Sequence, residues 1–381
     1  MNVITLLQPP RIVFGDGCAP QCASFLATQG VRRVLLVTST QVLSLLEELR
    51  GALKAAGVEV VLSQPVDQEP TCARFEAVLR HARTEAVTGV LGIGGGSAID
   101  VAKLAAALLN GGQTVPEVFG IDRLCGRKLP LVCLPTTAGT GAEVSPNAIL
   151  LDEVEMLKKG VVSPHLVPDA AYVDPRLTWS VPPAVTAATG LDALTHCIEA
   201  YANKFAHPIV DVYALQGVRL IANHLARAVR DGKDAEARAA LSLGSLYGGL
   251  CLGPVNTAAV HALAYPLGGR FHIPHGVSNA LLLPHVLRFN YSAAAARYAE
   301  IAVALGVARN GSDLSTAEHG VGRLTQLSRE CGVPQRLSEL NIPREAIPEM
   351  ARAAMQVVRL LKNNPRPLLE ADAAGIYEAA F

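Results

Sequence analysis

The pattern of hydrophobic residues changes at about residue 180, and this change limits the folds open to the chain. Before it, near-continuous runs of β-branched residues and leucine are typical of strands buried on both faces of a sheet. These runs are "RRVLLVTS" (32–39), "VEVVLSQPV" (58–66), "AVTGVLGIGGG" (86–96) and "KLPLVCLPTT" (128–137). Helical patterns lie between them, at 42–57 and 73–85. This alternation predicts a doubly wound α/β fold, with parallel strands joined by right-handed crossovers.

A proline-rich segment marks the predicted border between two domains. "DPRLTWSVPP" (174–183) contains three prolines, and from Ala184 onward the helical period dominates. A chain of 381 residues, half of them hydrophobic, is longer than one ordinary core requires. We therefore expect an α/β domain at 1–182 and an all-helical domain at 183–381.

The charge balance bears on the class of partner. Lysine plus arginine and aspartate plus glutamate are equal in number, so no strong field attracts nucleic acid or an anionic membrane. Residues 239–269 carry no charged side chain, but Gly253-Pro254 and Asn256 divide this stretch. Each half is shorter than the roughly 20 residues of a membrane span. Two buried helices, and a small uncharged or weakly charged ligand, are the expectation.

The N-terminal sequence and the cysteines indicate the compartment. "MNVITLLQPPRIVFGDG" has no basic stretch before its short apolar run, unlike a secretory signal. Eight cysteines are scattered without any CxxC pair, which fits neither a disulfide framework nor a zinc ribbon. We expect a cytoplasmic protein with reduced cysteines that are mostly buried.

Two glycine-bearing loops follow predicted strands. "GVLGIGGGSAIDVAKLAAAL" (89–108) runs from a strand through Gly94–Ser97 into a helix, where free N–H groups and the helix dipole suit a phosphate. Such glycines also fit a simple tight turn. The second loop, "PTTAGTGAEVSP" (135–146), changes the balance, because ligands bind at the carboxyl ends of parallel strands. The two loops together favour a nucleotide.

Ser39 stands where doubly wound folds commonly carry an acidic residue. That acid binds a ribose hydroxyl and rejects a 2′-phosphate. Ser39 follows the strand pattern at 32–39, and a serine there fits an ordinary loop residue equally well. Nothing at this position repels NADP.

Titratable residues gather in apolar sequence after residue 190. Asp192 and His196 lie four residues apart in "GLDALTHCIEAY" (190–201), so both can reach one ion from a helix face. The pair alone also fits a helix-stabilising contact. Downstream, "VHALAYPLGGRFHIPHGVSNALLLPHV" (260–286) holds four of the ten histidines, namely His261, His272, His275 and His285. Burying so many titratable groups is unfavourable unless they pair or coordinate, which favours Fe(II) or Zn(II).

Four segments together resemble the signatures of a known family. They are "GGGSAIDVAK", "PTTAGTGAEV", "ATGLDALTHCIEAY" and "HALAYPLGGRFHIPHGVSNALLLPHVLRFN". In order and over essentially the whole chain, they are similar to the iron-containing (group III) alcohol dehydrogenases, which include lactaldehyde reductase and butanol dehydrogenases. The resemblance implies a Rossmann-like N-terminal domain and an all-α C-terminal domain, the dehydroquinate synthase-like architecture, with the active site in the cleft.

The resemblance also assigns residues. It implies that the metal ligands are Asp192, His196, His261 and His275. It places the cofactor pyrophosphate at Gly95, Gly96 and Ser97, and the nicotinamide half at Thr136, Thr137 and Ser145. A cofactor-contacting lysine of the family matches Lys158, although "VEMLKKG" also allows Lys159.

Two positions depart from the family pattern. Many relatives have aspartate in place of Ser39 and thereby exclude NADP, so both NAD and NADP remain open here. Several relatives carry a proton-relaying histidine where this chain has Tyr265. Because a tyrosine side chain ordinarily titrates near pH 10, His272 or solvent is the alternative relay.

The expected activity follows from these parts. We expect a metal-dependent, NAD(P)-linked oxidoreductase that interconverts small uncharged alcohols and aldehydes, with the metal as Lewis acid on the substrate oxygen. An oxo-acid reductase of the maleylacetate reductase type, a lyase related to dehydroquinate synthase and a non-catalytic metal-binding protein are the alternatives. Fe(II) and Zn(II) cannot be separated by ligand type. The resemblance implies a homodimer.

Overall fold

The computed structural model describes residues 3–154 and 157–381. Met1 and Asn2 of the N-terminal stretch, and Glu155 and Met156 of "VEMLKKG", lie outside the described residues. The chain forms two compact units. The α/β unit comprises Leu7–Thr137 and Gly141–Ser180. The helical unit comprises Val181–Phe381, Ala138–Thr140 and the N-terminal segment that ends at Leu6.

A parallel sheet forms the centre of the α/β unit. Its strand order is β1-β9-β6-β4-β2-β3, and every neighbouring pair is parallel. The strands are β1 (Arg11–Phe14), β2 (Arg33–Val37), β3 (Glu59–Leu62), β4 (Gly89–Gly94), β6 (Leu131–Pro135) and β9 (Ala170–Val173). The predicted doubly wound parallel sheet is confirmed.

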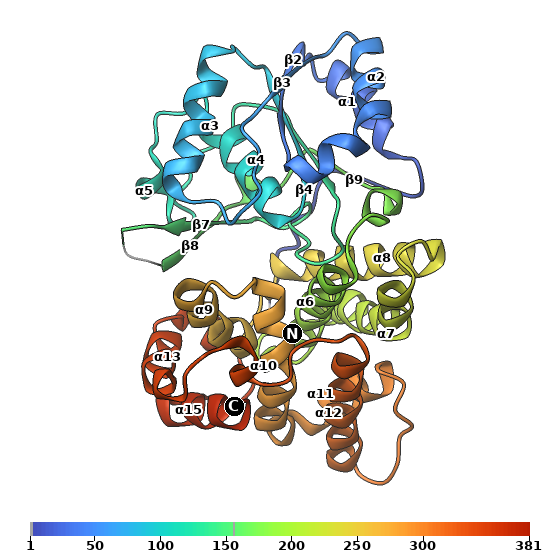
Figure 1. The fold of residues 1–381 in the computed structure, drawn as a ribbon, viewed down its shortest axis with the longest axis vertical. Coiled ribbons are helices and arrows are strands. Elements are labelled where there is room, and N and C mark those ends of the chain that lie inside the picture. Colours follow the sequence, from blue (N-terminus) through green and yellow to red (C-terminus); the bar gives the residue numbers. More distant parts are fainter. Residues whose placement is uncertain (1–2, 155–156) are drawn as a thin grey trace. The chain divides into compact units, whose positions relative to one another are not determined.

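Helices cover both faces of this sheet, as Figure 1 shows. They are α1 (Cys22–Thr28), α2 (Glu47–Ala55), α3 (Cys72–Thr84) and α4 (Gly96–Leu108), with the short α5 (Val115–Val118) following. Alternate residues of β2 point to opposite faces: Val34 and Leu36 pack in the core with α1 and α2, whereas Leu35 and Val37 pack in the core with α3 and α4. A strand covered on both faces has no polar side, which explains its continuous apolar run.

The sequence patterns missed several strands of this unit. Besides β1 and β9, a second sheet of order β5-β8-β7 is formed by β5 (Gly120–Ile121), β7 (Asn147–Asp152) and β8 (Leu157–Val162). β7 and β8 are antiparallel, and these strands are short or mixed in polarity. The predicted helix at 42–57 is two elements, a 3₁₀ helix at Thr40–Leu45 followed by α2.

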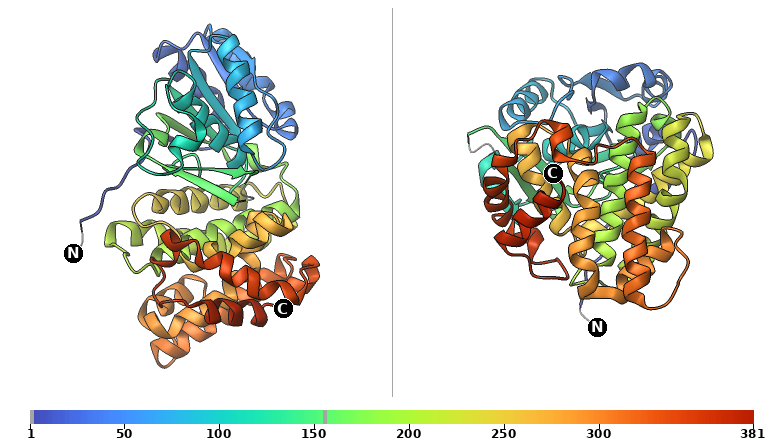
Figure 2. Two further views of the ribbon diagram at one scale, coloured as in Figure 1. Left: turned by 90° about the vertical axis from the view of Figure 1, so that its left-hand side faces the viewer. Right: turned by 60° about the horizontal axis from the view of Figure 1, so that its bottom comes forward.

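The helical unit contains no strand among its described residues. Its helices are α6 (Pro183–Tyr201), α7 (Pro208–Arg230), α8 (Ala235–Leu252), α9 (Ala259–Phe271), α10 (His275–Asn290), α11 (Ala295–Ala304), α12 (Asp313–Glu330), α13 (Ile347–Met355), α14 (Val358–Leu361) and α15 (Glu370–Ala379). Several of them pack side by side as a bundle (Figure 2). The charge-free stretch forms α8 and α9, and no described helix is long and apolar enough to cross a membrane.

Helix α6 is enclosed by its neighbours. α7, α8 and α10 all pack against it, and every residue from Gly190 to Tyr201 is buried. The faces of α6 that bear Asp192 and His196 are therefore covered as well. These two side chains lie inside the unit rather than on its surface.

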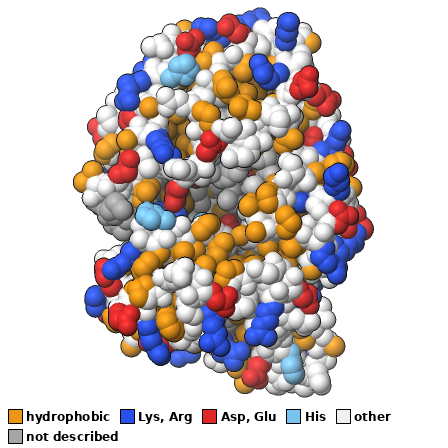
Figure 3. Space-filling view, in the orientation of Figure 1, with side chains coloured by type: hydrophobic (Ala, Val, Ile, Leu, Met, Phe, Trp, Pro, Cys, Tyr) orange, Lys and Arg blue, Asp and Glu red, His pale blue; other side chains and the backbone are white. Residues whose placement is uncertain are grey.

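The exposed charges are mixed in sign. On the face drawn in Figure 3, lysine and arginine side chains alternate with aspartate and glutamate, and neither sign forms a large field. This distribution agrees with the formal net charge of zero. No electrostatic steering toward a polyanion follows from this face.

Candidate functional site

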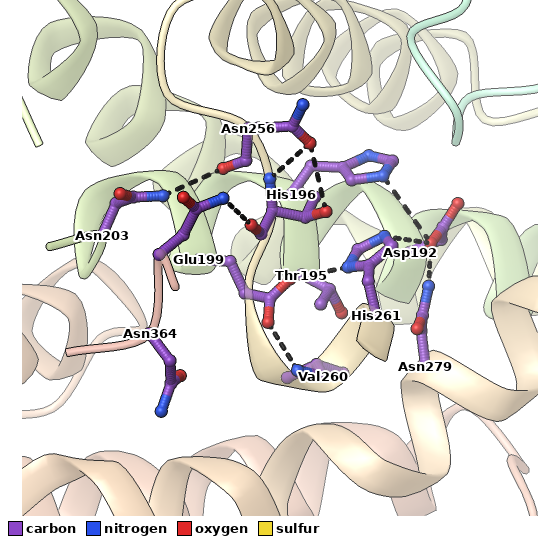
Figure 4. A network of polar contacts seen from close by, with 12 residues as sticks. Asp192, Thr195, His196, Glu199, Asn203, Asn256, Val260, His261, Asn279 and Asn364 are labelled. Carbon is purple, nitrogen blue, oxygen red and sulfur yellow. Dashed lines mark hydrogen bonds and ion pairs between the residues drawn. The ribbon is translucent and has the colours of Figure 1, made fainter. Parts of the chain in front are cut away.

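Three imidazoles surround one carboxylate oxygen in the helical unit. Oδ1 of Asp192 lies 3.9 Å from Nε2 of His196, 3.6 Å from Nε2 of His261 and 3.7 Å from Nε2 of His275. Figure 4 shows the side chains of His196 and His261 pointing toward Asp192. The structure thus brings together all four residues that the resemblance implied as metal ligands.

These distances suit a shared ion better than direct contacts. All three exceed hydrogen-bond length, and Nε2 of His261 is buried with no hydrogen-bond partner among the described residues. Two ligands about 2.0–2.2 Å from one ion, at a tetrahedral angle, lie about 3.4 Å apart. Ligand atoms of Asp192, His261 and His275 lie within 4.8 Å of one another. Nε2 of His196 lies outside this tighter group but within 3.9 Å of Oδ1 of Asp192. Imidazole nitrogens with one carboxylate oxygen fit a borderline cation such as Fe(II) or Zn(II).

Three helices contribute these side chains. Asp192 and His196 are one turn apart on α6, His261 is on α9, and His275 is the first residue of α10. The start of α10 approaches α6 closely at Gly276, where an added Cβ would lie 2.6 Å from the carbonyl oxygen of Ala188. A glycine is required at this contact, since any larger residue would push His275 away from Asp192.

Glu199, which the sequence analysis missed, orients His261. Its Oε2 lies 2.6 Å from Nδ1 of His261, and its Oε1 accepts a 2.6 Å hydrogen bond from the backbone N–H of Val260 (Figure 4). The carboxylate is buried. A proton held on Nδ1 by Glu199 leaves the Nε2 lone pair directed at the cluster. The sequence did contain a signal for this residue, because Glu199 follows Asp192 by seven residues and therefore lies on the same helical face.

Asn279 is a second residue that the sequence analysis missed. Its Nδ2 donates a 2.6 Å hydrogen bond to Oδ1 of Asp192 and lies 3.1 Å from Nε2 of His275. Asn279 follows His275 by four residues, so the two side chains share one face of α10. The amide therefore restrains the carboxylate oxygen on which the three imidazoles converge.

The electrostatics of the cluster favour a positive charge at its centre. Burial would raise the pKa of the Asp192 carboxyl, but the imidazoles of His196, His275 and His261 hold that pKa well below its ordinary range. Burial opposes protonation of His261 as well, yet Glu199 and Asp192 together raise its pKa to about 9. Burial dominates at His196, where it lowers the pKa against the pull of Asp192.

The two proton-relay candidates lie in different settings. Tyr265 is on α9, one turn after His261; its ring centroid is 6.3 Å from that of His275, and its hydroxyl oxygen accepts a 2.9 Å hydrogen bond from Arg359. His272 ends α9 in a left-handed conformation (φ 55°), and its side chain is exposed. His285 lines a separate cavity of about 550 Å³ between α10, α12 and α15.

The two glycine-bearing loops begin side by side in the α/β unit, although Ala138–Thr140 of the second loop belong to the helical unit. β4 and β6, which lead into them, are parallel neighbours, and the N–H of Thr136 donates to the carbonyl of Gly94 at 2.9 Å. Gly95 precedes α4, and an added Cβ there would contact the side chain of Thr137 at 3.5 Å. Gly96 and Ser97 form the first turn of α4, so their N–H groups are available to an anion.

Lysines fix the segments around these loops. Lys103, on α4, is fully buried; its Nζ donates to the carbonyl oxygens of Ser145 (2.7 Å) and Asn147 (2.8 Å) and to the Ser145 hydroxyl (3.2 Å). The predicted cofactor residue Ser145 is therefore held against α4. Lys158 pairs with Glu69 at 2.6 Å, and Lys159 pairs with Asp152 at 2.8 Å.

Sequence models of one protein family match nearly the whole chain. The iron-containing alcohol dehydrogenase model matches residues 9–175, and the model of the C-terminal part of the Fe-containing alcohol dehydrogenase family matches residues 186–381. The chain belongs to the iron-containing alcohol dehydrogenase family. The resemblance noted in the sequence is confirmed.

Individual relatives agree over the full length. The chain is 40% identical to a long-chain-alcohol dehydrogenase of Geobacillus thermodenitrificans, with 100% of this chain and 98% of the relative covered. It is 32% identical to an NAD-dependent methanol dehydrogenase of Bacillus methanolicus, with 98% of each chain covered. A crystal structure of 1,3-propanediol oxidoreductase superposes with a TM-score of 0.97 at 34% identity, with 100% of both chains covered.

Family membership defines the type of enzyme. The chain is an oxidoreductase of the iron-containing alcohol dehydrogenase type, and its Asp192 cluster supplies a candidate metal site. The relatives do not favour the alternative of an oxo-acid reductase. Alcohols and aldehydes are therefore the substrate class.

Proposed function

We propose that the protein transfers hydride between a nicotinamide dinucleotide and a small, uncharged alcohol or aldehyde. Asp192, His196, His261 and His275 bind Fe(II), or Zn(II), in this proposal. The convergence of three imidazole nitrogens on Oδ1 of Asp192, at 3.6–3.9 Å, carries the proposal. It is supported by Nε2 of His261, which has no hydrogen-bond partner among the described residues, since a buried polar atom of this kind is rare without a ligand.

The loops of the α/β unit bind the cofactor in this proposal. Two neighbouring parallel strands end in them, and a helix of 13 residues begins at Gly96. The cofactor-binding residues that we propose are Gly95, Gly96, Ser97, Thr136, Thr137, Ser145 and Lys158, together with Ser39 at the adenosine end. The methanol dehydrogenase relative is described as NAD-dependent, which supports NAD or NADP here.

The chain's residues have separable tasks in the reaction. When bound, the metal supplies Lewis acidity toward the substrate oxygen and the nicotinamide supplies or accepts the hydride. Glu199 keeps the proton of His261 on Nδ1. The Tyr265 hydroxyl accepts from Arg359 and keeps its own proton to donate. The imidazole of His272 is exposed to solvent, and we propose Tyr265 and His272 as the catalytic proton relay.

The domain border and the cellular setting are further parts of the proposal. We place the cofactor domain at 1–182 and the metal-binding domain at 183–381. All eight cysteines are free, which supports a reducing compartment, the cytoplasm. The family resemblance supports a homodimer, which light scattering of the purified protein tests.

Reconstitution with metal is the direct test of the function. The purified protein is stripped with a chelator under anaerobic conditions, and oxidation of NADH and NADPH by short aldehydes is followed before and after Fe(II) or Zn(II) is restored. We expect activity to vanish on stripping and to return with one of the metals. Aldehyde reduction that persists without any metal would contradict the proposal.

A further inference from the structure

An acidic side chain lies beside Ser39, although it comes from a different strand. β2 and β3 are parallel neighbours, and after β3 the chain continues along the end of β2: the N–H of Ser63 donates to the carbonyl of Leu36 (3.0 Å) and that of Val66 to the carbonyl of Thr38 (2.9 Å). This path carries the next residue, Asp67, to the carboxyl end of β2. Sequence spacing gave no sign of it.

Two hydrogen bonds fix the Asp67 carboxylate at that position. Its Oδ1 accepts from the backbone N–H of Thr40 at 2.7 Å, and its Oδ2 accepts from the Thr40 hydroxyl at 2.7 Å. Since the Thr40 nitrogen is bonded to the Ser39 carbonyl carbon, the carboxylate lies beside the Ser39–Thr40 peptide. The hydrogen bonds from Thr40 lower the pKa of Asp67, so the group is charged at neutral pH.

The negative charge of Asp67 is not neutralised within the described part of the chain, where no lysine, arginine or histidine forms an ion pair with it. The nearby Glu69 differs, because Lys158 pairs with it at 2.6 Å. Asp67 is also exposed, so an approaching ligand meets its charge directly. In doubly wound folds, an acid at the end of the strand beside the glycine loop is the group that selects NAD over NADP.

We propose that Asp67 determines the cofactor preference and rejects the 2′-phosphate of NADP, in place of the acid that Ser39 lacks. This inference rests on the proposed function, because it assumes that a nicotinamide dinucleotide binds to the glycine-bearing loops. It revises the reading of Ser39 as a position that leaves NADP unopposed. The protein prefers NADH, and the preference resides in the charge of residue 67.

The substitution Asp67→Asn tests this with little change of shape. Asparagine keeps an acceptor for the Thr40 N–H, and the Thr40 hydroxyl can accept from the new NH₂ group, so the main change is the loss of the charge. Binding of NADH and NADPH is measured by their fluorescence, a readout that does not depend on catalysis. We expect the ratio of the NADPH to the NADH dissociation constant to fall about tenfold, the effect of one charge a few ångströms from a phosphate, with NADH affinity changed less than about twofold. Glu318→Gln, an exposed acid of the helical unit, is the charge-matched control.

A salt titration of the unaltered protein keeps the test open if the variant fails to fold. Added salt screens an exposed charge, so the ratio of the two dissociation constants should fall as ionic strength rises. An unchanged ratio in Asp67→Asn, or a ratio insensitive to salt in the unaltered protein, would overturn the role of Asp67. Failure of the unaltered protein to bind either dinucleotide would instead refute the proposed function.

Discussion

Lys103 of the α/β unit and Asp192 of the helical unit are both buried charges, but their surroundings differ. The ammonium group of Lys103 uses its donors on three oxygen atoms at 2.7–3.2 Å. Among the described residues, the carboxylate of Asp192 accepts a hydrogen bond from Asn279, while three imidazole nitrogens stop 3.6–3.9 Å away. The first arrangement is complete as it stands, whereas the second leaves room for a cation.

The contrast separates a structural charge from a binding site. A buried polar group without partners is costly, so folded proteins seldom keep one that has no ligand. Lys103 meets this requirement within the chain, and its task is to hold Ser145 and Asn147 against α4. Nε2 of His261 does not meet it among the described residues. Satisfied hydrogen bonds at the one site and unsatisfied atoms at the other therefore predict different responses to mutation.

Asp192→Asn should give the largest effect. The amide cannot supply the anionic ligand, so the protein should lose its metal and its aldehyde reductase activity should fall by more than about 100-fold, the upper end of losses for residues that only support a ligand. Metal content by elemental analysis and turnover with NADH provide the two readouts. Asp122→Asn removes an exposed charge of the same kind and should alter neither. Full metal content in Asp192→Asn would contradict the assigned site.

Lys103→Met should destabilise the fold and leave the metal site intact. Methionine keeps most of the length of the side chain, but it strands three acceptors and leaves Asp100 and Glu143 without a buried counter-charge, which costs about 3–5 kcal/mol. Chemical denaturation measures the loss. The exposed Lys54→Met on α2 is the matched control, expected within about 0.5 kcal/mol of the unaltered protein. If Lys103→Met also lowered the metal affinity by a similar free energy, the structural charge and the metal site would not be independent.

Glu199→Gln should weaken metal binding about 10–100-fold. If the glutamine oxygen accepts from the Val260 N–H, its NH₂ group faces Nδ1 of His261 and moves the imidazole proton to Nε2, which then cannot bind a cation. Competition with a chromogenic chelator for Zn(II) measures the affinity. Glu318→Gln should leave it unchanged. An affinity within about twofold of the unaltered protein would show that Glu199 does not orient His261.

Much of the fold and of the ligand set was accessible from the sequence, because these features repeat or stand out locally. Buried parallel strands produce continuous apolar runs, and titratable residues gather in apolar sequence after residue 190, from which the family resemblance selects Asp192 and three histidines. Glu199 and Asp67 were missed for the opposite reason. Their roles depend on hydrogen bonds to residues 62 and 27 positions away, His261 and Thr40, and only the folded chain creates those contacts.

Strands without a hydrophobic signature were missed for a related reason. β8 has the sequence "LKKGVV", and its lysines are tolerated because Lys158 pairs with Glu69 and Lys159 pairs with Asp152 of the neighbouring strand β7. β1 has four residues, too few to show a period. Tertiary pairing, rather than local propensity, determines such elements.

The smallest predicted effect concerns the pH dependence of stability. It tests whether the Glu143 carboxyl is protonated or is ionised by the nearby Lys103. Burial raises the pKa of Glu143 from 4.5 to about 7. The folded protein therefore binds this proton more tightly than the unfolded chain does, and stability falls as pH rises from about 4.5 to about 7. Glu143→Gln does not titrate, so the decline across this window should become shallower, by on the order of 2 kcal/mol in total. Asp100, whose pKa burial raises to about 6, keeps part of the slope in the variant. The free energy of unfolding of both proteins is measured by denaturation at pH 5 and pH 7.5. If it changes with pH equally in both, Lys103 keeps Glu143 ionised throughout. The α/β unit would then hold a fully formed buried ion pair.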